Sequence, residues 1–146
     1  YGARGTLLGV TRGSTAAHVV RAVLEGVAHR GADLVEAAEA DGGVRIERLR
    51  IDGGMSQNPV FVQALADATG RPVEVAPYTE STTLGAGLLA GLGVGIWESI
   101  DDLASTWRPR SATAPSQTDR AAAREQWARA LARSSGWIPA LSALDF

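Results

Sequence analysis

The chain has 146 residues, of which 45% are hydrophobic and 21% are charged, and its formal net charge is -2. This length and composition predict one globular domain with a buried core, and the charge excludes the basic surface typical of nucleic-acid or anionic-membrane binding. All 14 basic residues are arginine and cysteine is absent, which excludes a lysine-dependent phosphate loop, a disulfide framework and a cysteine zinc site. The missing cysteine fits a cytoplasmic protein, and no apolar run is long enough to span a membrane.

The first third of the chain predicts one long helix followed by a strand. Ser14 or Thr15 can cap the helix, and glycines near residues 41–43 end it. Residues 44–51 alternate loosely between apolar and polar types, so they predict a partly exposed strand. Within the helix the apolar residues recur at helical spacing: Val19, Val20, Val23, Leu24, Val27, Leu34 and Val35.

A second helix and a second strand follow. Asn58 and Pro59 are the residue types expected at a helix cap and at the first helical position, and Gly70 ends that helix. Residues 73–75 predict a short strand. Residues 82–93 are nearly all small or aliphatic, which predicts a helix packed closely against a sheet or another helix.

The rest of the chain predicts two helices joined by a linker. Ser99 can cap a short helix that runs to Trp107, and Asp119 can cap the last helix. Proline and small polar residues between these helices predict the linker, and the apolar tail from residue 137 onward is expected to dock on the protein. The predicted divisions are residues 1–108, the linker 109–118, and the helix with its tail, 119–146.

The turn between the first strand and the second helix is the strongest candidate site. Asp52 ends the strand, and Gly53 with Gly54 allows a tight turn and a close backbone approach to a ligand. Free amides at the start of the following helix favour an anion. A turn that binds nothing is the alternative, because a glycine pair by itself is a weak motif.

Several motifs occur in one order along residues 1–108, and together they resemble the FGGY family of carbohydrate kinases. They are residues 5–10 (GTLLGV), 18–25 (HVVRAVLE), 52–54 (DGG) with Gln63 and Asp67, 80–87 (ESTTLGAG) and 90–97 (AGLGVGIW). Ordered motifs are far more specific than any one of them. Within the family the likeness is greatest to the glycerol kinases, through residues 3–5, 11–13, 95–97 and 107–109.

This resemblance implies an α/β fold, the C-terminal part of an actin-like ATPase domain of the ribonuclease H type that lacks its first strands. It implies ATP and magnesium as cofactors, with nucleotide contacts from the backbone of Gly54 and from the Asn58 amide near the adenine. Gly53 is a weaker candidate for contact, since it can simply shape the turn. An Asn amide offers a purine edge both a donor and an acceptor. In the family the catalytic Asp and the polyol pocket lie before these motifs, so no catalytic residue and no metal ligand are assigned here.

The implied reaction of the intact enzyme is phosphoryl transfer from ATP to glycerol. Xylulose and gluconate kinases share most of the motifs, so another sugar or polyol substrate, bound through the missing N-terminal domain, is an alternative. A second alternative is a non-catalytic interaction module, because the last helix and the tail could form a partner surface. Nucleic acid and membrane are not expected as partners, and a homo-oligomer is left open.

The other polar residues are given structural interpretations. Asp52 is expected to anchor the turn by accepting hydrogen bonds from nearby amides. His18, Arg21 and Glu25 can form a hydrogen-bonded cluster on one helix face, and Glu80 can cap the glycine-rich helix. The scattered arginines are expected to lie on solvent-exposed faces; they are Arg45, Arg48, Arg50, Arg124 and Arg129.

Overall fold

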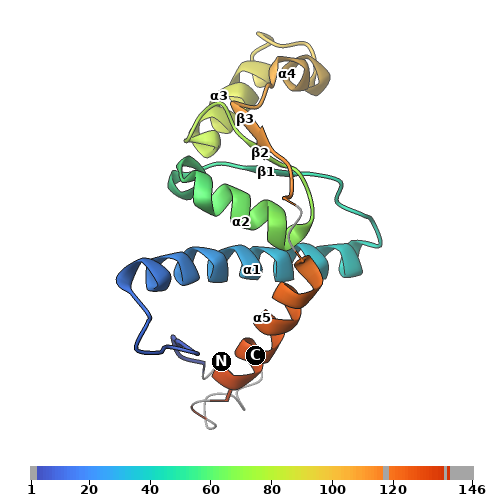
Figure 1. Ribbon diagram of the computed structural model, residues 1–146. Helices are drawn as coiled ribbons and strands as arrows, with labels where there is room; N and C mark the ends of the chain where they lie inside the picture. The colour runs from blue at the N-terminus through green and yellow to red at the C-terminus, as the bar shows by residue number, and fades with distance from the viewer. Residues whose placement is uncertain (1–2, 117–118, 137, 139–146) are drawn as a thin grey trace.

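The computed structural model describes residues 3–116, 119–136 and 138, and these form an α/β architecture (Figure 1). The predicted helices and both predicted strands are present in the predicted order. The elements are α1 (Ala16–Gly42), β1 (Leu49–Ile51), the 3-10 helix η1 (Gly54–Gln57), α2 (Pro59–Thr69), β2 (Val73–Val75), α3 (Ser81–Gly93), α4 (Ile100–Thr106), β3 (Ser111–Thr113) and α5 (Arg120–Ser134).

The ends of α1 lie where the capping signals predict them. The Thr15 N–H donates to His18 Nδ1 at 3.1 Å, so a histidine one turn into the helix satisfies the cap backbone. At the other end Gly43 adopts the left-handed conformation, with φ 62°, and its N–H donates to Glu39 O. His18 therefore belongs to the cap. Of the predicted cluster, only the Arg21–Glu25 bond forms, at 2.6 Å.

The three strands form one mixed sheet in the order β1-β2-β3. β1 and β2 are parallel, whereas β3 is antiparallel to β2. The linker prediction is wrong for Ser111–Thr113, because these residues form β3. Three small residues carry too little alternation to predict a strand, and the pairing depends on the exposed edge of β2.

β1 is shorter than the strand predicted for residues 44–51. The backbone of Ile46 is satisfied by side chains instead of by a neighbouring strand. Its N–H donates to Glu39 Oε1 at 2.7 Å, and its carbonyl accepts from Arg71 Nε at 2.6 Å. The Glu39–Arg71 ion pair thus removes this part of the chain from the sheet. The hydrogen bond from Ile46, then that from Arg71, lowers the pKa of Glu39.

The core lies where α2 sits between α1 and one face of the sheet (Figure 1). Val73 and Val75 point to this face, and Glu74 points to the other, as strand alternation requires. Small residues on α1 allow α2 to approach closely, and a Cβ on Gly31 would lie only 2.9 Å from Leu65 Cδ1. The buried residues are Ala28, Ala32, Phe61, Val62, Leu65, Ala66, Ala68, Val73 and Val75.

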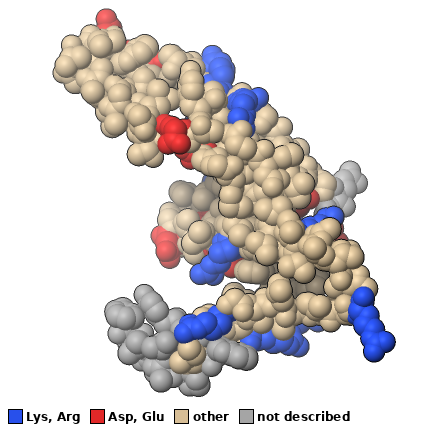
Figure 2. All heavy atoms as spheres, turned by 90° about the vertical axis from the view of Figure 1, so that its left-hand side faces the viewer, with Lys and Arg blue, Asp and Glu red and all other residues tan. Residues whose placement is uncertain are grey.

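Helices α3 and α4 form a lobe on the side of the sheet away from α1 (Figure 1). Within it, Trp97 covers Gly91, where an ideal Cβ would lie 3.1 Å from Trp97 Cδ1. Gly85 and Gly87 face open space, so the close packing predicted for α3 is not met among the described residues. Figure 2 shows few charged side chains on this lobe, at the upper left. Its exposed apolar residues are Leu84, Leu89, Val94, Ile96 and Ile100.

Helix α5 returns to α1 and α2 on the side away from the lobe (Figure 1). Asp119 caps it as predicted, with Oδ1 accepting from the Ala122 N–H at 3.1 Å. Ser99 caps α4 in the same way through the Asp102 N–H. Apart from Ile138, the predicted apolar tail lies outside the described residues.

Candidate functional site

The turn from β1 into α2 is built around Gly53. Its φ of 81° and ψ of -179° lie in a region that essentially only glycine occupies, so the chain can reverse here without a Cβ clash. Ser56 then closes the turn, since its hydroxyl donates to Gly53 O at 2.7 Å. η1 follows directly and delivers the chain to Asn58. Gly53 therefore has a conformational role, whatever else it contacts.

Asn58 is the N-cap of α2, as predicted. Its Oδ1 accepts from the N–H groups of Val60, at 2.9 Å, and Phe61, at 3.3 Å. Both partners are donors, so the side-chain oxygen faces the helix and the Nδ2 group faces away from it. No residue in the described part of the chain accepts a hydrogen bond from Nδ2. Capping uses the amide oxygen, so Nδ2 is the part of this side chain that has no partner among the described residues.

Gly54 presents an open backbone surface next to Asn58. An ideal Cβ built on Gly54 meets no atom within 4 Å, and its φ is not positive. Nothing in this fold therefore requires glycine at this position. A ligand that approaches the backbone closely would require it, because a side chain would occupy the same space. Gly54 and Asn58 thus offer a ligand a close backbone approach and one side-chain hydrogen-bond donor.

Asp52 connects this turn to the start of α3. Its Oδ2 accepts from the Ser81 N–H at 3.2 Å, which confirms the predicted anchoring role and identifies the amide. Glu80 occupies the cap position of α3 but makes no side-chain cap bond, so its predicted capping role is wrong. The Asp52 carboxylate meets the free amides at the start of α3 instead, since those amides attract negative charge. Within the described ranges, no three Asp, Glu or His side chains gather closely enough to hold a metal ion.

A second polar cluster, which the sequence did not indicate, joins α1 to α5. Arg124 donates to Asp33 Oδ1 at 2.6 Å and to Glu36 Oε2 at 2.9 Å, and Trp127 Nε1 donates to Asp33. Trp127 also stacks on His29, with 5.5 Å between ring centroids. The arginine prediction is wrong for Arg124, whose side chain is only 16% exposed, whereas Arg45, Arg48, Arg50 and Arg129 are largely solvated.

The charges of this cluster control its titration. Burial and then the positive charge of Arg124 lower the pKa of His29. Burial opposes ionisation of Asp33, but hydrogen bonds from Arg124 and Trp127 outweigh it and lower the pKa of the carboxyl. Both groups stabilise the docked helix in their unprotonated forms. Helical spacing places Arg120, Arg124 and Trp127 on one face of α5, but it does not indicate their partners on α1.

Comparison with known proteins decides the family. Residues 1–94 match the FGGY family of carbohydrate kinases, C-terminal domain. The chain belongs to this family. An FGGY glycerol kinase from Deinococcus radiodurans is 46% identical over 137 residues, which cover 92% of this chain and 27% of that protein.

Solved structures of FGGY kinases have the same fold. The crystal structure of Plasmodium falciparum glycerol kinase with ADP superposes with a TM-score of 0.82 at 36% identity, covering 91% of this chain and 27% of that chain. Xylulose kinase from Rhodospirillum rubrum gives a TM-score of 0.74 at 25% identity, with 90% and 26% covered. These neighbours confirm the fold as part of an actin-like ATPase. The chain spans roughly a quarter of the length of the relatives it matches. None of the helices in the described ranges combines the length and apolarity needed to cross a bilayer.

Proposed function

We propose that this chain is the C-terminal, nucleotide-binding portion of an ATP-dependent glycerol kinase. The observation that carries the proposal is the turn after β1, which combines an open backbone at Gly54 with an outward donor at Asn58. The likeness to a glycerol kinase whose structure contains ADP supports a nucleotide as the ligand. Identity favours glycerol over xylulose as the acceptor, at 36% against 25%.

In this proposal Gly54 lies against the nucleotide through its backbone, and Asn58 donates from Nδ2 to an acceptor on the adenine edge. Gly53 shapes the turn. Bound MgATP supplies the phosphoryl group, and its metal balances the charge of the phosphates. The described residues offer no cluster for that metal, so we propose that it arrives with the nucleotide. We assign no proton-accepting residue to this chain. A chain without cysteine is compatible with a reducing compartment, and we propose the cytoplasm for the whole enzyme.

The nucleotide assignment is tested by Asn58→Ser in the complete kinase. Serine caps a helix about as well as asparagine but lacks the Nδ2 donor, so the stability of α2 should be kept. We expect the KM for ATP to rise about tenfold, because a hydrogen bond to the ligand is lost. The KM for glycerol and the melting temperature should change little. Steady-state kinetics with each substrate varied in turn provides the measurement.

Gly54→Val provides a second, independent test. The fold leaves room for a side chain there, so valine should raise the KM for ATP by blocking the backbone approach. Equal increases in the KM values for ATP and glycerol would show that Gly54 acts only on the fold.

An active enzyme that phosphorylates xylulose or gluconate in preference to glycerol would favour the alternative substrates.

A further inference from the structure

The candidate nucleotide turn is held by two hydrogen bonds to residues far away in the sequence. On one side, Asp52 Oδ2 accepts from the Ser81 N–H at 3.2 Å. On the other, Gln57 Oε1 accepts from Arg110 Nη1 at 2.7 Å. The two contacts lie before and after Gly54, and Gln57 directly precedes Asn58. These bonds therefore hold the chain on both sides of Gly54 and next to Asn58, the two residues proposed to contact the nucleotide.

Arg110 is itself fixed to the sheet. Its N–H donates to Val75 O at 2.9 Å, immediately before β3 begins pairing with β2. The backbone of this residue is thus hydrogen-bonded to β2, and its guanidinium donates to Gln57 at the end of η1. The edge of the sheet is linked in this way to the residue before Asn58. On the other side of the turn, the first residue of α3, Ser81, holds Asp52 through its backbone N–H.

We propose that Arg110 and Asp52 are positioning residues. They do not contact the nucleotide, but they hold the Gly53–Gly54 turn in the geometry that binds it. The inference rests on the proposed function. A site binds most tightly when its groups are already in place, because the ligand then does not have to order them. Loss of either bond should therefore weaken ATP binding and leave the chemical step unchanged.

The first test compares Arg110→Ala, Gln57→Ala and the double variant in the complete kinase. We expect each single variant to raise the KM for ATP about two- to tenfold, as for one lost hydrogen bond. The kcat and the KM for glycerol should stay within twofold. Because the two side chains act through one bond, the double variant should be no worse than the more affected single variant.

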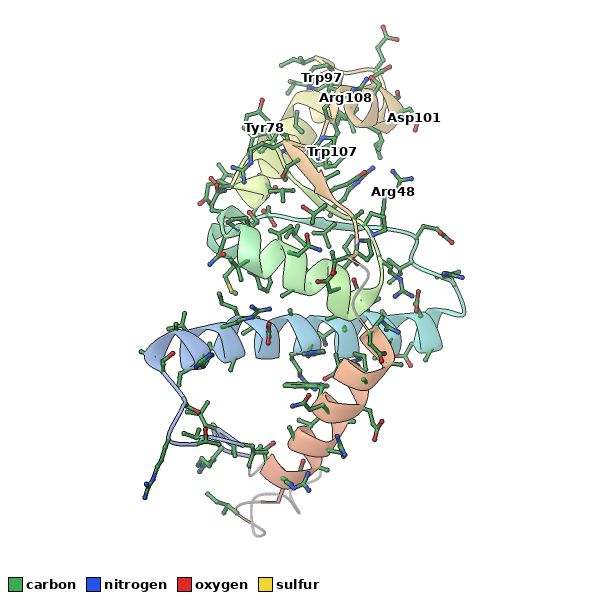
Figure 3. The ribbon with its side chains drawn as sticks, in the orientation of Figure 1. Arg48, Tyr78, Trp97, Asp101, Trp107 and Arg108 are labelled. Carbon is green, nitrogen blue, oxygen red and sulfur yellow. The ribbon has the colours of Figure 1, made fainter. Side chains whose placement is uncertain are left out.

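Arg108→Ala is the matched control. Arg108 lies two residues before Arg110 and has the same charge, but its guanidinium donates to Ser105 O and Trp107 O, at the end of α4 (Figure 3). Its removal makes the same change in net charge and should leave the KM for ATP unchanged. Equal effects of Arg108→Ala and Arg110→Ala would mean that general electrostatics are responsible, and would overturn the role of Arg110.

For Asp52, the comparison is between Asp52→Ala and Asp52→Asn, with Glu80→Gln as the control. Asparagine keeps an acceptor for the Ser81 N–H, so Asp52→Asn should largely preserve the KM for ATP while Asp52→Ala raises it. Equal loss in both Asp52 variants would mean that the negative charge matters, and would overturn positioning through this bond. Glu80 makes no cap bond, so Glu80→Gln should have no effect.

The inference and the proposed function fail differently. If Asn58→Ser raises the KM for ATP but Arg110→Ala and Asp52→Ala leave it within twofold of wild type, the positioning role is wrong and the nucleotide turn stands. If Asn58→Ser itself has no effect in an active kinase, the nucleotide assignment is wrong. A fall in melting temperature without a change in the KM for ATP would show a purely structural role for either residue.

Discussion

Helices α2 and α5 both pack on α1, but through different chemistry. α2 contributes buried apolar side chains, including Phe61 at 9% and Leu65 at 6% exposure. α5 contributes Arg124 and Trp127, which meet the carboxylates of Asp33 and Glu36. No residue of α5 is fully buried. The apolar contact between α1 and α2 should be insensitive to pH, because burial of hydrocarbon does not involve a titratable group.

The polar contact has a different sensitivity. Its strength depends on the ionisation of Asp33 and on a neutral His29, so it should weaken when either group is protonated. The comparison therefore teaches that α1, α2 and the sheet form the stable unit, whereas the docking of α5 depends on the protonation states of Asp33 and His29. The proposed nucleotide turn belongs to the stable unit, since α2 starts directly after Asn58.

The largest effect is expected for Leu65→Ala. Leu65 fills the contact between α2 and Gly31 of α1, so its truncation should leave a cavity and cost about 3 kcal/mol of unfolding free energy. Urea denaturation, followed by circular dichroism, measures the change. A cost below about 1 kcal/mol would contradict an apolar α1–α2 core, and the exposed Leu89→Ala is the matched control.

Arg124→Ala should have a smaller and more local effect. It leaves Asp33 without its closest cation and should cost α5 about 2 kcal/mol of docking free energy, as for hydrogen bonds to a charged group. Amide hydrogen exchange should accelerate in α5 while α2 stays protected. Arg129→Ala is the control, because Arg129 is exposed and its ion pair with Glu125 spans 3.9 Å. Equal acceleration in α2 and α5 would remove the distinction between the two helices.

The smallest effect is the pH dependence of α5. The folded-state pKa of His29 lies below its ordinary value of 6.5, so its contribution is present above that pH and is lost as the pH falls. The lowered pKa of Asp33 acts in the same direction, below its ordinary value of 3.8. Hydrogen exchange in α5 should therefore accelerate between pH 7 and pH 5 relative to His29→Phe measured at the same pH. Phenylalanine keeps the stack on Trp127 but cannot be protonated. Identical pH profiles would exclude His29 as the sensitive group.

Local signals predicted much of the fold and part of the site. Asn58 and Pro59 begin α2 because the cap oxygen and the proline ring act on neighbouring backbone atoms, and Gly70 ends it for a similar local reason. The two glycines of the turn were found in the same way. The FGGY resemblance rested on ordered motifs, and the family match confirms it.

The missed features depend on partners far away in the sequence. β3 forms because β2 offers an edge, and residues 44–48 stay outside the sheet because Arg71 and Glu39 bind the Ile46 backbone. Likewise, the α1–α5 cluster joins residues about 90 positions apart. No local pattern predicts such pairs, because the sequence contains many other residues of the same charge or polarity that could serve as the partner.

By itself, the amino-acid sequence determined the helices, the caps of α1, α2, α4 and α5, the glycine turn and the family, because these depend on residues close together or on the order of motifs. Only the tertiary structure decided which polar atoms remain available. The local cap already uses the Asn58 oxygen, whereas only the packing of distant segments joined Asp52 to Ser81 and Gln57 to Arg110. The physical reason is that a hydrogen-bonding group is free or occupied according to its neighbours in space, and those are set by packing.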